Sequence, residues 1–349
     1  MEHPCLRGDP APADAPALHH RRPRVRLPRR RDRSRSSLHR IRVPSSSERS
    51  APAARDGARG VPVLAPIPRA PLRRDHGGQH IAALVTVVLS VLAAALYAIG
   101  VRRMRRSWPL WRTAVFFLGL GAVIAALGPP IDGAASIFFA WHMVQHMLLT
   151  AIAPPLLILG APVRPLLRGM PGAVRAGVVR PLARARWVRA FVHFVRHPLI
   201  AAALYVGGLY AWHLPDLYDA ALLDARIHLI EHAWFFVTAL VFWSVVVDPV
   251  PFRGTLSYGA RLPYLLVLGA AQNTVLGGIL SFSSRLLYTA YEEVPVFDLD
   301  RVTDQRVGGA IMWVVGDFVF LAAASVAFFL WLAEEEEMQK RRERIASRQ

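Results

Sequence analysis

Cysteine is almost absent from this sequence. The single cysteine is Cys5, which lies among the first few residues. Disulfides and thiolate metal sites are therefore excluded from the rest of the chain. Any metal site there must use nitrogen, oxygen or thioether ligands.

Acidic residues are scarce beside 42 Lys and Arg, and residues 1–30 lack the apolar stretch of a signal peptide. Residues 1–79 hold 18 of the basic residues against 7 acids and are rich in Pro, Ser and Ala. A segment of that composition cannot bury enough apolar surface to fold, so we expect a disordered tail over 1–79.

Two alternatives apply to this tail. Arginine clusters bind nucleic acid or anionic lipid, but the aromatic residues that accompany nucleic-acid binding are missing, so no nucleic acid is expected as a partner. The other alternative is that translation starts near Val61 and that the mature protein lacks most of the tail.

Long apolar runs dominate the rest of the chain, and 54% of the residues in the full sequence are hydrophobic. A bilayer core of about 30 Å needs about 20 apolar residues in a helix. The sequence predicts an all-α membrane bundle of seven spans within residues 80–334, followed by a charged tail, 335–349. The expected spans are His80–Val101, Leu110–Gly128, Phe138–Gly160, Pro198–Trp212 (extendable backward to Phe191), Ile227–Val247, Leu262–Phe282 and Gly308–Leu332.

Arginine in the connecting loops predicts the orientation. The first loop has four Arg, and the third, 161–197, has eight Arg and no acid, while the second, fourth and sixth are mainly acidic. Positively charged loops stay in the cytoplasm. We therefore expect the C-terminus in the cytoplasm and the N-terminus outside.

With this topology six histidines share the outer leaflet. They are His80, His142, His146, His213, His228 and His232. A pair at i and i+4 faces one way, so His142/His146 and His228/His232 each offer two imidazoles to one ion. A structural alternative is that these rings only hydrogen-bond neighbouring helices.

Methionines occur next to these histidines, and thioether and imidazole ligands together suit Cu(I). Met143 and Met147 lie about 100° round the helix from the histidine pair, so the four side chains cannot share one ion. Met312, in the last span, is a candidate further ligand.

Two other functions fit parts of the pattern. The stretch from His228 to His232, HLIEH, matches the H-x-x-E-H zinc motif of a protease class in which the Glu is the general base. That interpretation needs a third ligand and access for peptide and water. Paired histidines on facing helices also ligate haem in electron-transfer bundles.

Polar residues at membrane depth complete the candidate set. Glu231, Asp304 and Asp317 are expected to support the histidines from outside the ligand shell. Gln272, Asn273, Gly277 and Gly278 are expected to pack and cross-link helices.

Three blocks resemble one known family in order along the chain. HMVQHMLLTAIAPPLLILGAP, HLPDLYDAALLDARIHLIEHAWFFVTALVFWSVVVDP and DQRVGGAIMWVVGDFVFL are similar to the CtaG-type cytochrome c oxidase assembly factors, over residues 80–334. The resemblance implies a seven-span, non-enzymatic helper in the bacterial plasma membrane that assists copper insertion into a haem-copper oxidase, whose subunits would be its partners. The matching positions are His142, His146, His213, His228, His232, Asp304, Gln305 and Asp317.

Overall fold

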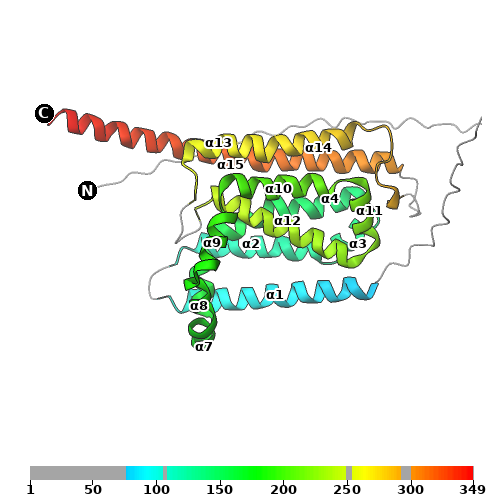
Figure 1. Ribbon diagram of the computed structural model, residues 1–349, viewed down its shortest axis with the longest axis horizontal. Helices are drawn as coiled ribbons and strands as arrows, with labels where there is room; N and C mark the ends of the chain where they lie inside the picture. The colour runs from blue at the N-terminus through cyan, green and yellow to red at the C-terminus, as the bar shows by residue number, and fades with distance from the viewer. Residues whose placement is uncertain (1–75, 105–107, 249–253, 292–299, 349) are drawn as a thin grey trace, which may run out of the picture. The chain divides into compact units, whose positions relative to one another are not determined.

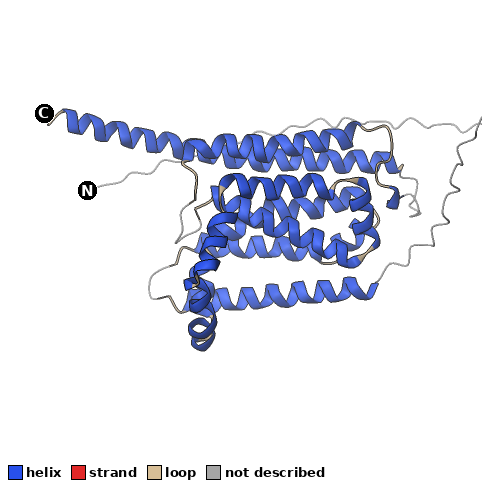
Figure 2. Cartoon of the chain, viewed as in Figure 1, coloured by secondary structure: helices blue, strands red, loops and turns tan. Residues whose placement is uncertain are grey.

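The computed structural model describes residues 76–104, 108–248, 254–291 and 300–348, all within one compact unit. Helices make up its regular structure, and no strand occurs in these ranges (Figures 1 and 2). The first nine α-helices are α1 (His76–Arg102), α2 (Leu110–Leu127), α3 (Ile131–Ala135), α4 (Phe139–Met147), α5 (Ala153–Leu159), α6 (Val163–Gly169), α7 (Gly172–Val174), α8 (Arg180–Arg184) and α9 (Arg186–Val195). The others are α10 (Pro198–Trp212), α11 (Pro215–Leu223), α12 (Ala225–Val246), α13 (Tyr258–Leu265), α14 (Ala271–Phe282) and α15 (Arg301–Ala346). The described part therefore confirms the all-α class.

Four shorter helical segments join these helices. The π-helical turns are η1 (Leu148–Ile152), η2 (Arg175–Val179) and η3 (Leu266–Ala270), and η4 (Thr289–Tyr291) is a 3₁₀ turn.

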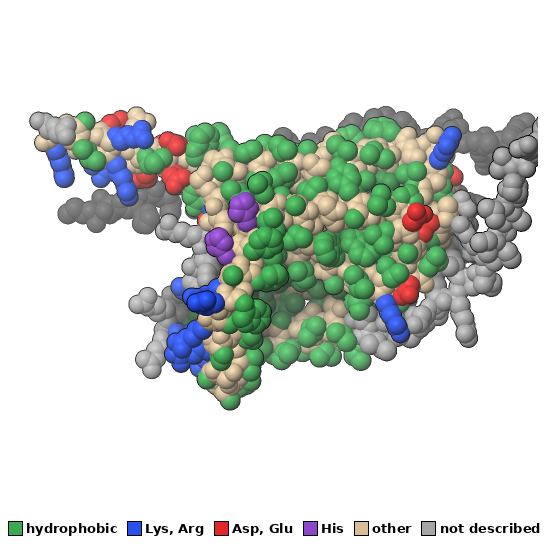
Figure 3. Space-filling model, viewed as in Figure 1, with side chains coloured by type: hydrophobic (Ala, Val, Ile, Leu, Met, Phe, Trp, Pro, Cys, Tyr) green, Lys and Arg blue, Asp and Glu red, His purple; other side chains and the backbone are tan. Residues whose placement is uncertain are grey.

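Six described helices are long and apolar enough to cross a membrane. They are Ala83–Arg102, Leu110–Leu127, Phe139–Leu159, Ala225–Val246, Tyr258–Phe282 and Arg301–Ala346. Each overlaps an expected span, although Arg301–Ala346 is much longer than the expected Gly308–Leu332. Hydrophobic side chains cover the visible face between the ends of the bundle (Figure 3). The protein is thus a helical membrane protein.

The remaining expected span, Pro198–Trp212, is α10. Its 15 residues cover only about 22 Å, and it qualifies as a span only together with α9, from which it is bent by 66°. The bend lies at His197, the residue before Pro198. A residue before proline avoids the helical region of backbone conformation, and the ψ of His197, 129°, is extended.

The predicted tail 1–79 lies almost wholly outside the described residues. Its last four residues, 76–79, belong to α1. The predicted C-terminal tail, 335–349, continues α15 as helix through Ala346. Pairs four residues apart support that extension, since Lys340 contacts Glu336 at 3.5 Å and Gln339 donates to Glu343 at 2.9 Å.

The arginine-rich third loop is helical, from α6 to α9. On α9 the side chains of Trp187, Phe191 and Phe194 follow the i, i+4, i+7 pattern of one helix face, and all three are exposed. Arg186 and Arg189 lie on the same helix. This combination of an apolar face and basic residues is typical of a helix lying in the membrane interface.

A double proline shapes the helix that contains His142 and His146. Pro154 has no N–H to donate to the carbonyl of Thr150, four residues earlier. The indole of Trp243, on α12, donates to that carbonyl instead, at 3.0 Å. The Thr150 hydroxyl in turn donates to the His146 carbonyl, at 2.7 Å. The widened turn η1 is therefore tied to α12, which contains the second histidine pair.

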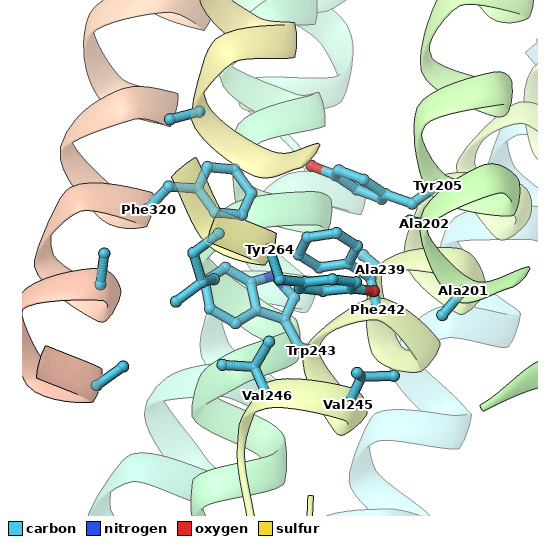
Figure 4. Packing of buried hydrophobic residues seen from close by; sticks show 14 of the residues in the cluster. Ala201, Ala202, Tyr205, Ala239, Phe242, Trp243, Val245, Val246, Tyr264 and Phe320 are labelled. Atoms are coloured by element: carbon cyan, nitrogen blue, oxygen red, sulfur yellow. The ribbon is translucent and has the colours of Figure 1, made fainter. Parts of the chain in front are cut away.

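Aromatic rings form the core beyond that turn. Figure 4 shows Phe242 and Trp243 of α12 among Tyr205, Tyr264 and Phe320 of three other helices. Trp243 stacks on Phe320 with ring centroids 5.1 Å apart, and Phe242 packs on Tyr264 at 4.6 Å. Rings this large and fully buried fix how α10, α12, α13 and α15 meet.

Helices α14 and α15 pack closely because glycines face each other. A Cβ on Gly277 would lie 2.7 Å from the carbonyl oxygen of Gly309, whereas a Cβ on Gly278 meets nothing within 4 Å. The prediction of close approach is confirmed for Gly277 and wrong for Gly278. Gln272 does cross-link helices as expected, accepting from the Tyr210 hydroxyl of α10 at 2.8 Å.

These neighbouring glycines give a matched test of the packing. Gly277→Ala forces two helix backbones apart, which costs about 1–3 kcal/mol and corresponds to a fall of roughly 5 °C in unfolding temperature. Gly278→Ala is expected to leave that temperature unchanged or slightly raised. Thermal unfolding of both variants in the same detergent measures the difference, and equal transitions would contradict the packing described here.

Candidate metal centre

The first turns of α4 and α12 bring four ligand side chains together. His142 comes from α4, and His228, Glu231 and His232 come from α12; one ligand atom of each lies within 4.8 Å of the other three. Donors on one tetrahedral ion, with bonds of about 2.1 Å, are about 3.4 Å apart. Small side-chain rotations therefore suffice to place all four on one ion.

Helical spacing explains the half of the site on α12. Positions 228, 231 and 232 are related by three and four residues, so they share one face. The rings of His228 and His232 have centroids 4.1 Å apart, and the ring of His142 lies 5.2 Å from His228 and 6.0 Å from His232. The two faces that the sequence analysis singled out therefore meet.

Glu231 is the most deeply buried member, with no exposed surface. Its two carboxylate oxygens have no hydrogen-bond partner among the described residues. One oxygen lies 3.8 Å from Nε2 of His142 and the other 3.7 Å from Nε2 of His146. Glu231 was expected outside the ligand shell, but this position is within reach of a bound ion.

Unpaired nitrogens point to the same centre. Nε2 of His142, His228 and His232 is buried and, in the described part of the protein, has no hydrogen-bond partner. Buried polar atoms are normally paired, and each unpaired one is costly. A cation bound between these nitrogens and the Glu231 oxygens would satisfy all of them at once.

Two tyrosines orient His142. The hydroxyl of Tyr218 lies 3.0 Å and that of Tyr291 3.1 Å from Nδ1 of His142, and Tyr291 donates to the Ala135 carbonyl at 3.1 Å. Tyr218 can donate to Tyr291, at 3.3 Å. In this arrangement Nδ1 carries the proton and Nε2 keeps its lone pair for a metal, which is the usual support of a metal-binding imidazole.

Sequence reasoning missed both tyrosines, which follow no motif. They lie on α11 and η4, more than 70 residues from His142 in sequence. The one signal in the sequence was their place in segments that connect membrane spans, where aromatic residues are common.

Removing both hydroxyls tests this support. Tyr218→Phe/Tyr291→Phe is expected to weaken metal binding about 10–100-fold, the usual effect of losing the partners of a ligating histidine. Tyr288→Phe is the matched control, since its hydroxyl donates to the backbone of His213 in the same aromatic cluster. Competition titrations with a metal chelator measure the affinities, and equal losses in the two proteins would contradict the orienting role.

His146 and His213 lie directly beside the four-residue group. The ring centroid of His146 is 4.3 Å from that of His142, 5.6 Å from that of His232 and 6.1 Å from that of His213. Nδ1 of His213 is 2.7 Å from the Leu209 carbonyl, so it carries the proton and leaves Nε2 available. The structure thus brings five of the six predicted histidines into one cluster, namely His142, His146, His213, His228 and His232. The side chain of the sixth, His80, lies outside the described residues.

The methionines lie in the apolar packing next to the cluster. Met143, Met147 and Met312 are buried in one hydrophobic group with Phe139, Phe235 and Tyr218.

The carboxylates of Asp304 and Asp317 form hydrogen bonds outside the metal centre. Asp304 accepts from the backbone N–H groups of Phe139 and Ala140, at 2.7 and 3.2 Å, and so anchors the start of α4. Asp317 accepts from the Thr274 hydroxyl in the α14 and α15 pair. Gln305 is bonded to the backbone of residues 285 and 287. Asp304 therefore acts on the centre by positioning the helix of His142.

Outside the spans, one acidic residue orders the turn after α12. Partial burial acts to raise the pKa of Asp248, but the Gly254 N–H and the Arg261 guanidinium outweigh it and hold this pKa below its usual value. Both oxygens of Asp248 contact Arg261, at 3.0 and 3.3 Å. This pair lies near Val246, the last residue of α12, whereas the histidine cluster lies at the start of that helix.

The donor set limits the chemistry of the centre. Imidazole and carboxylate ligands suit copper, zinc and iron, and thiolates are excluded since Cys5 lies outside the described residues and the rest of the chain has no cysteine. The rings of His142 and His228 contact each other directly, which favours an ion over a porphyrin plane between the helices. His142 does supply the third ligand that HLIEH alone lacked.

Fold and centre together define a helical membrane protein with a buried histidine and glutamate cluster. Residues 95–334 match the family described as cytochrome c oxidase caa3 assembly factor (Caa3_CtaG). The chain belongs to this family. The match spans α2 to α14 in full, the last part of α1 from residue 95 and α15 up to residue 334.

Curated relatives occur in mycobacteria. Uncharacterized proteins of Mycobacterium bovis and Mycobacterium tuberculosis are each 28% identical over 268 residues, which cover 74% of this chain and 40% of each relative. One of Mycobacterium leprae is 25% identical over 253 residues, covering 71% of this chain and 38% of the relative. The chain thus spans about two fifths of the length of these relatives. No solved structure matches it.

Proposed function

We propose that this protein binds copper at the centre of His142, His228, Glu231 and His232 and supplies it during assembly of a haem-copper oxidase. The observation that carries the proposal is the convergence of four ligand side chains from two membrane helices in a member of an oxidase assembly family. Copper is the cargo of the protein and not a cofactor for chemistry of its own. The role is therefore non-enzymatic.

The centre has the properties needed to hold an ion and release it. Nitrogen and oxygen ligands without thiolate bind Cu(I) less tightly than cysteine sites do, because thiolate is the softer ligand. His228 is only partly buried, while Glu231 and His232 are buried. An ion can therefore enter and leave past His228, at the end of the bundle where α12 begins.

The membrane arrangement belongs to the same proposal. Helix α10 would form the fourth of seven spans in a domain of residues 80–334, with α9 bent away from it into the cytoplasmic membrane interface. The eight arginines of 161–197 favour a cytoplasmic position for α6 to α9. The cluster then faces the outside of the bacterial plasma membrane, the N-terminus lies outside, and the tail 335–349 is cytoplasmic. The partners are the lipid bilayer and oxidase subunits.

A complementation experiment tests the function. In a strain lacking this gene, the wild-type protein should restore oxidase activity and the copper content of the purified oxidase, while His142→Ala/His232→Ala should restore neither. His193→Ala is the matched control, since this histidine is exposed on α9. Full oxidase copper with the double variant would contradict the proposal.

The purified protein also allows two other functions to be tested. A Soret band in the purified protein would indicate a haem-binding bundle. Zinc binding with peptide hydrolysis that is lost in Glu231→Gln would indicate the protease suggested by HLIEH.

A further inference from the structure

Two histidines of the cluster are not used by the four-residue group. His146 and His213 are 2% and 6% exposed. Both ring nitrogens of His146 and Nε2 of His213 lack a hydrogen-bond partner among the described residues. These three buried nitrogens are as unsatisfied as those of the first group, and one ion with four ligands cannot reach them as well.

Glu231 faces both groups at once. One of its oxygens lies 3.8 Å from Nε2 of His142, and the other lies 3.7 Å from Nε2 of His146. A carboxylate that binds one ion needs only one of its oxygens. A carboxylate whose two oxygens face imidazoles one helical turn apart has the geometry needed to bridge two metal ions.

The spacing of the remaining rings fits a second ion. Two imidazoles on one metal, with metal to nitrogen bonds of about 2.1 Å, have ring centroids about 5–6 Å apart. The centroids of His146 and His213 are 6.1 Å apart. The Leu209 carbonyl fixes the proton of His213 on Nδ1, so that Nε2 is the free donor.

We propose that the centre holds two ions bridged by Glu231. His142, His228 and His232 bind the first ion, and His146 and His213 bind the second. Carboxylate-bridged ions of this kind lie about 3.5–4 Å apart, and the centroids of His142 and His146, 4.3 Å apart, are consistent with that separation. This inference rests on the proposed function, because both ions are the copper that the protein supplies.

Copper stoichiometry of the purified full-length protein tests the second site. Cu(I) is titrated alone against a chromophoric chelator. We expect two ions per wild-type chain, one per His146→Ala/His213→Ala chain, and two per chain of the control His193→Ala/His197→Ala, whose histidines are exposed on or beside α9.

The outcomes separate this inference from the proposed function. No tightly bound copper in the wild type contradicts both. One ion in the wild type, or two ions retained by His146→Ala/His213→Ala, overturns the two-ion centre and leaves the proposed function standing. If the double variant does not fold, X-ray absorption of the loaded wild type decides, since only a two-ion centre gives copper to copper scattering near 3.5–4 Å.

Discussion

Glu231→Gln is expected to lose copper while the metal-free protein stays folded. The amide has the size of the carboxylate but no negative charge, so it neither balances the charge of an ion nor bridges two ions. We expect affinity to fall more than about 100-fold, beyond the effect of losing a residue that only supports a ligand. The carboxylate of Glu231 is buried without a hydrogen-bond donor among the described residues. Its neutral replacement should therefore leave metal-free stability unchanged or increased.

Opposite effects on binding and stability distinguish this role from a structural one. Chelator competition and thermal unfolding are measured on the same preparation, with Glu337→Gln as the control, since Glu337 is exposed on the C-terminal part of α15. Copper binding that survives in Glu231→Gln would contradict a ligand role. A Glu231→Gln protein that retains zinc but loses peptide hydrolysis would instead indicate that Glu231 is a general base.

Asp304→Ala is expected to have the largest effect on stability. Asp304 is 3% exposed and accepts from two backbone N–H groups at the start of α4, so alanine leaves a buried donor, on Phe139, and a partly buried one, on Ala140, unpaired. That loss costs about 2–6 kcal/mol at about 1–3 kcal/mol for each of the two unsatisfied groups. Since His142 lies one turn beyond these donors, copper affinity should fall as well.

The conservative variant and a matched control sharpen that prediction. Asp304→Asn keeps an acceptor oxygen and should recover part of both stability and affinity. Asp216→Ala removes an exposed aspartate of α11 and should change neither. If Asp304→Ala unfolds at the wild-type temperature in detergent, the anchoring of α4 described here is wrong.

The sequence was sufficient for six of the seven expected spans and insufficient for the segments between them. Hydropathy located helices such as α2 to within a residue, because span length is set by the bilayer. It did not reveal that residues 161–197 are helical, since their apolar residues form a stripe and not a run. Nor did it show α15 continuing beyond Leu332, where pairs of opposite charge extend the helix.

The residues of the candidate site also fall into those that the sequence predicts and those that it does not. Spacing within one helix predicted the shared face of His228 and His232, and depth predicted that His142 would lie at the same level. The contact of Tyr218 with His142 and the approach of Glu231 to His146 depend on packing between helices far apart in sequence, and periodicity does not encode this packing. Asp304 belongs to this second class, because its partners on α4 are about 165 residues away.

Copper binding by the purified protein tests the central claim most directly. Wild-type protein and His142→Ala/His232→Ala, both verified as folded, are loaded with Cu(I), passed through a desalting column and assayed for bound copper. X-ray absorption then identifies the ligand atoms. The account predicts copper retained by the wild type with nitrogen and oxygen ligands, and at least one ion fewer per chain in the double variant. Equal copper in both proteins would contradict it.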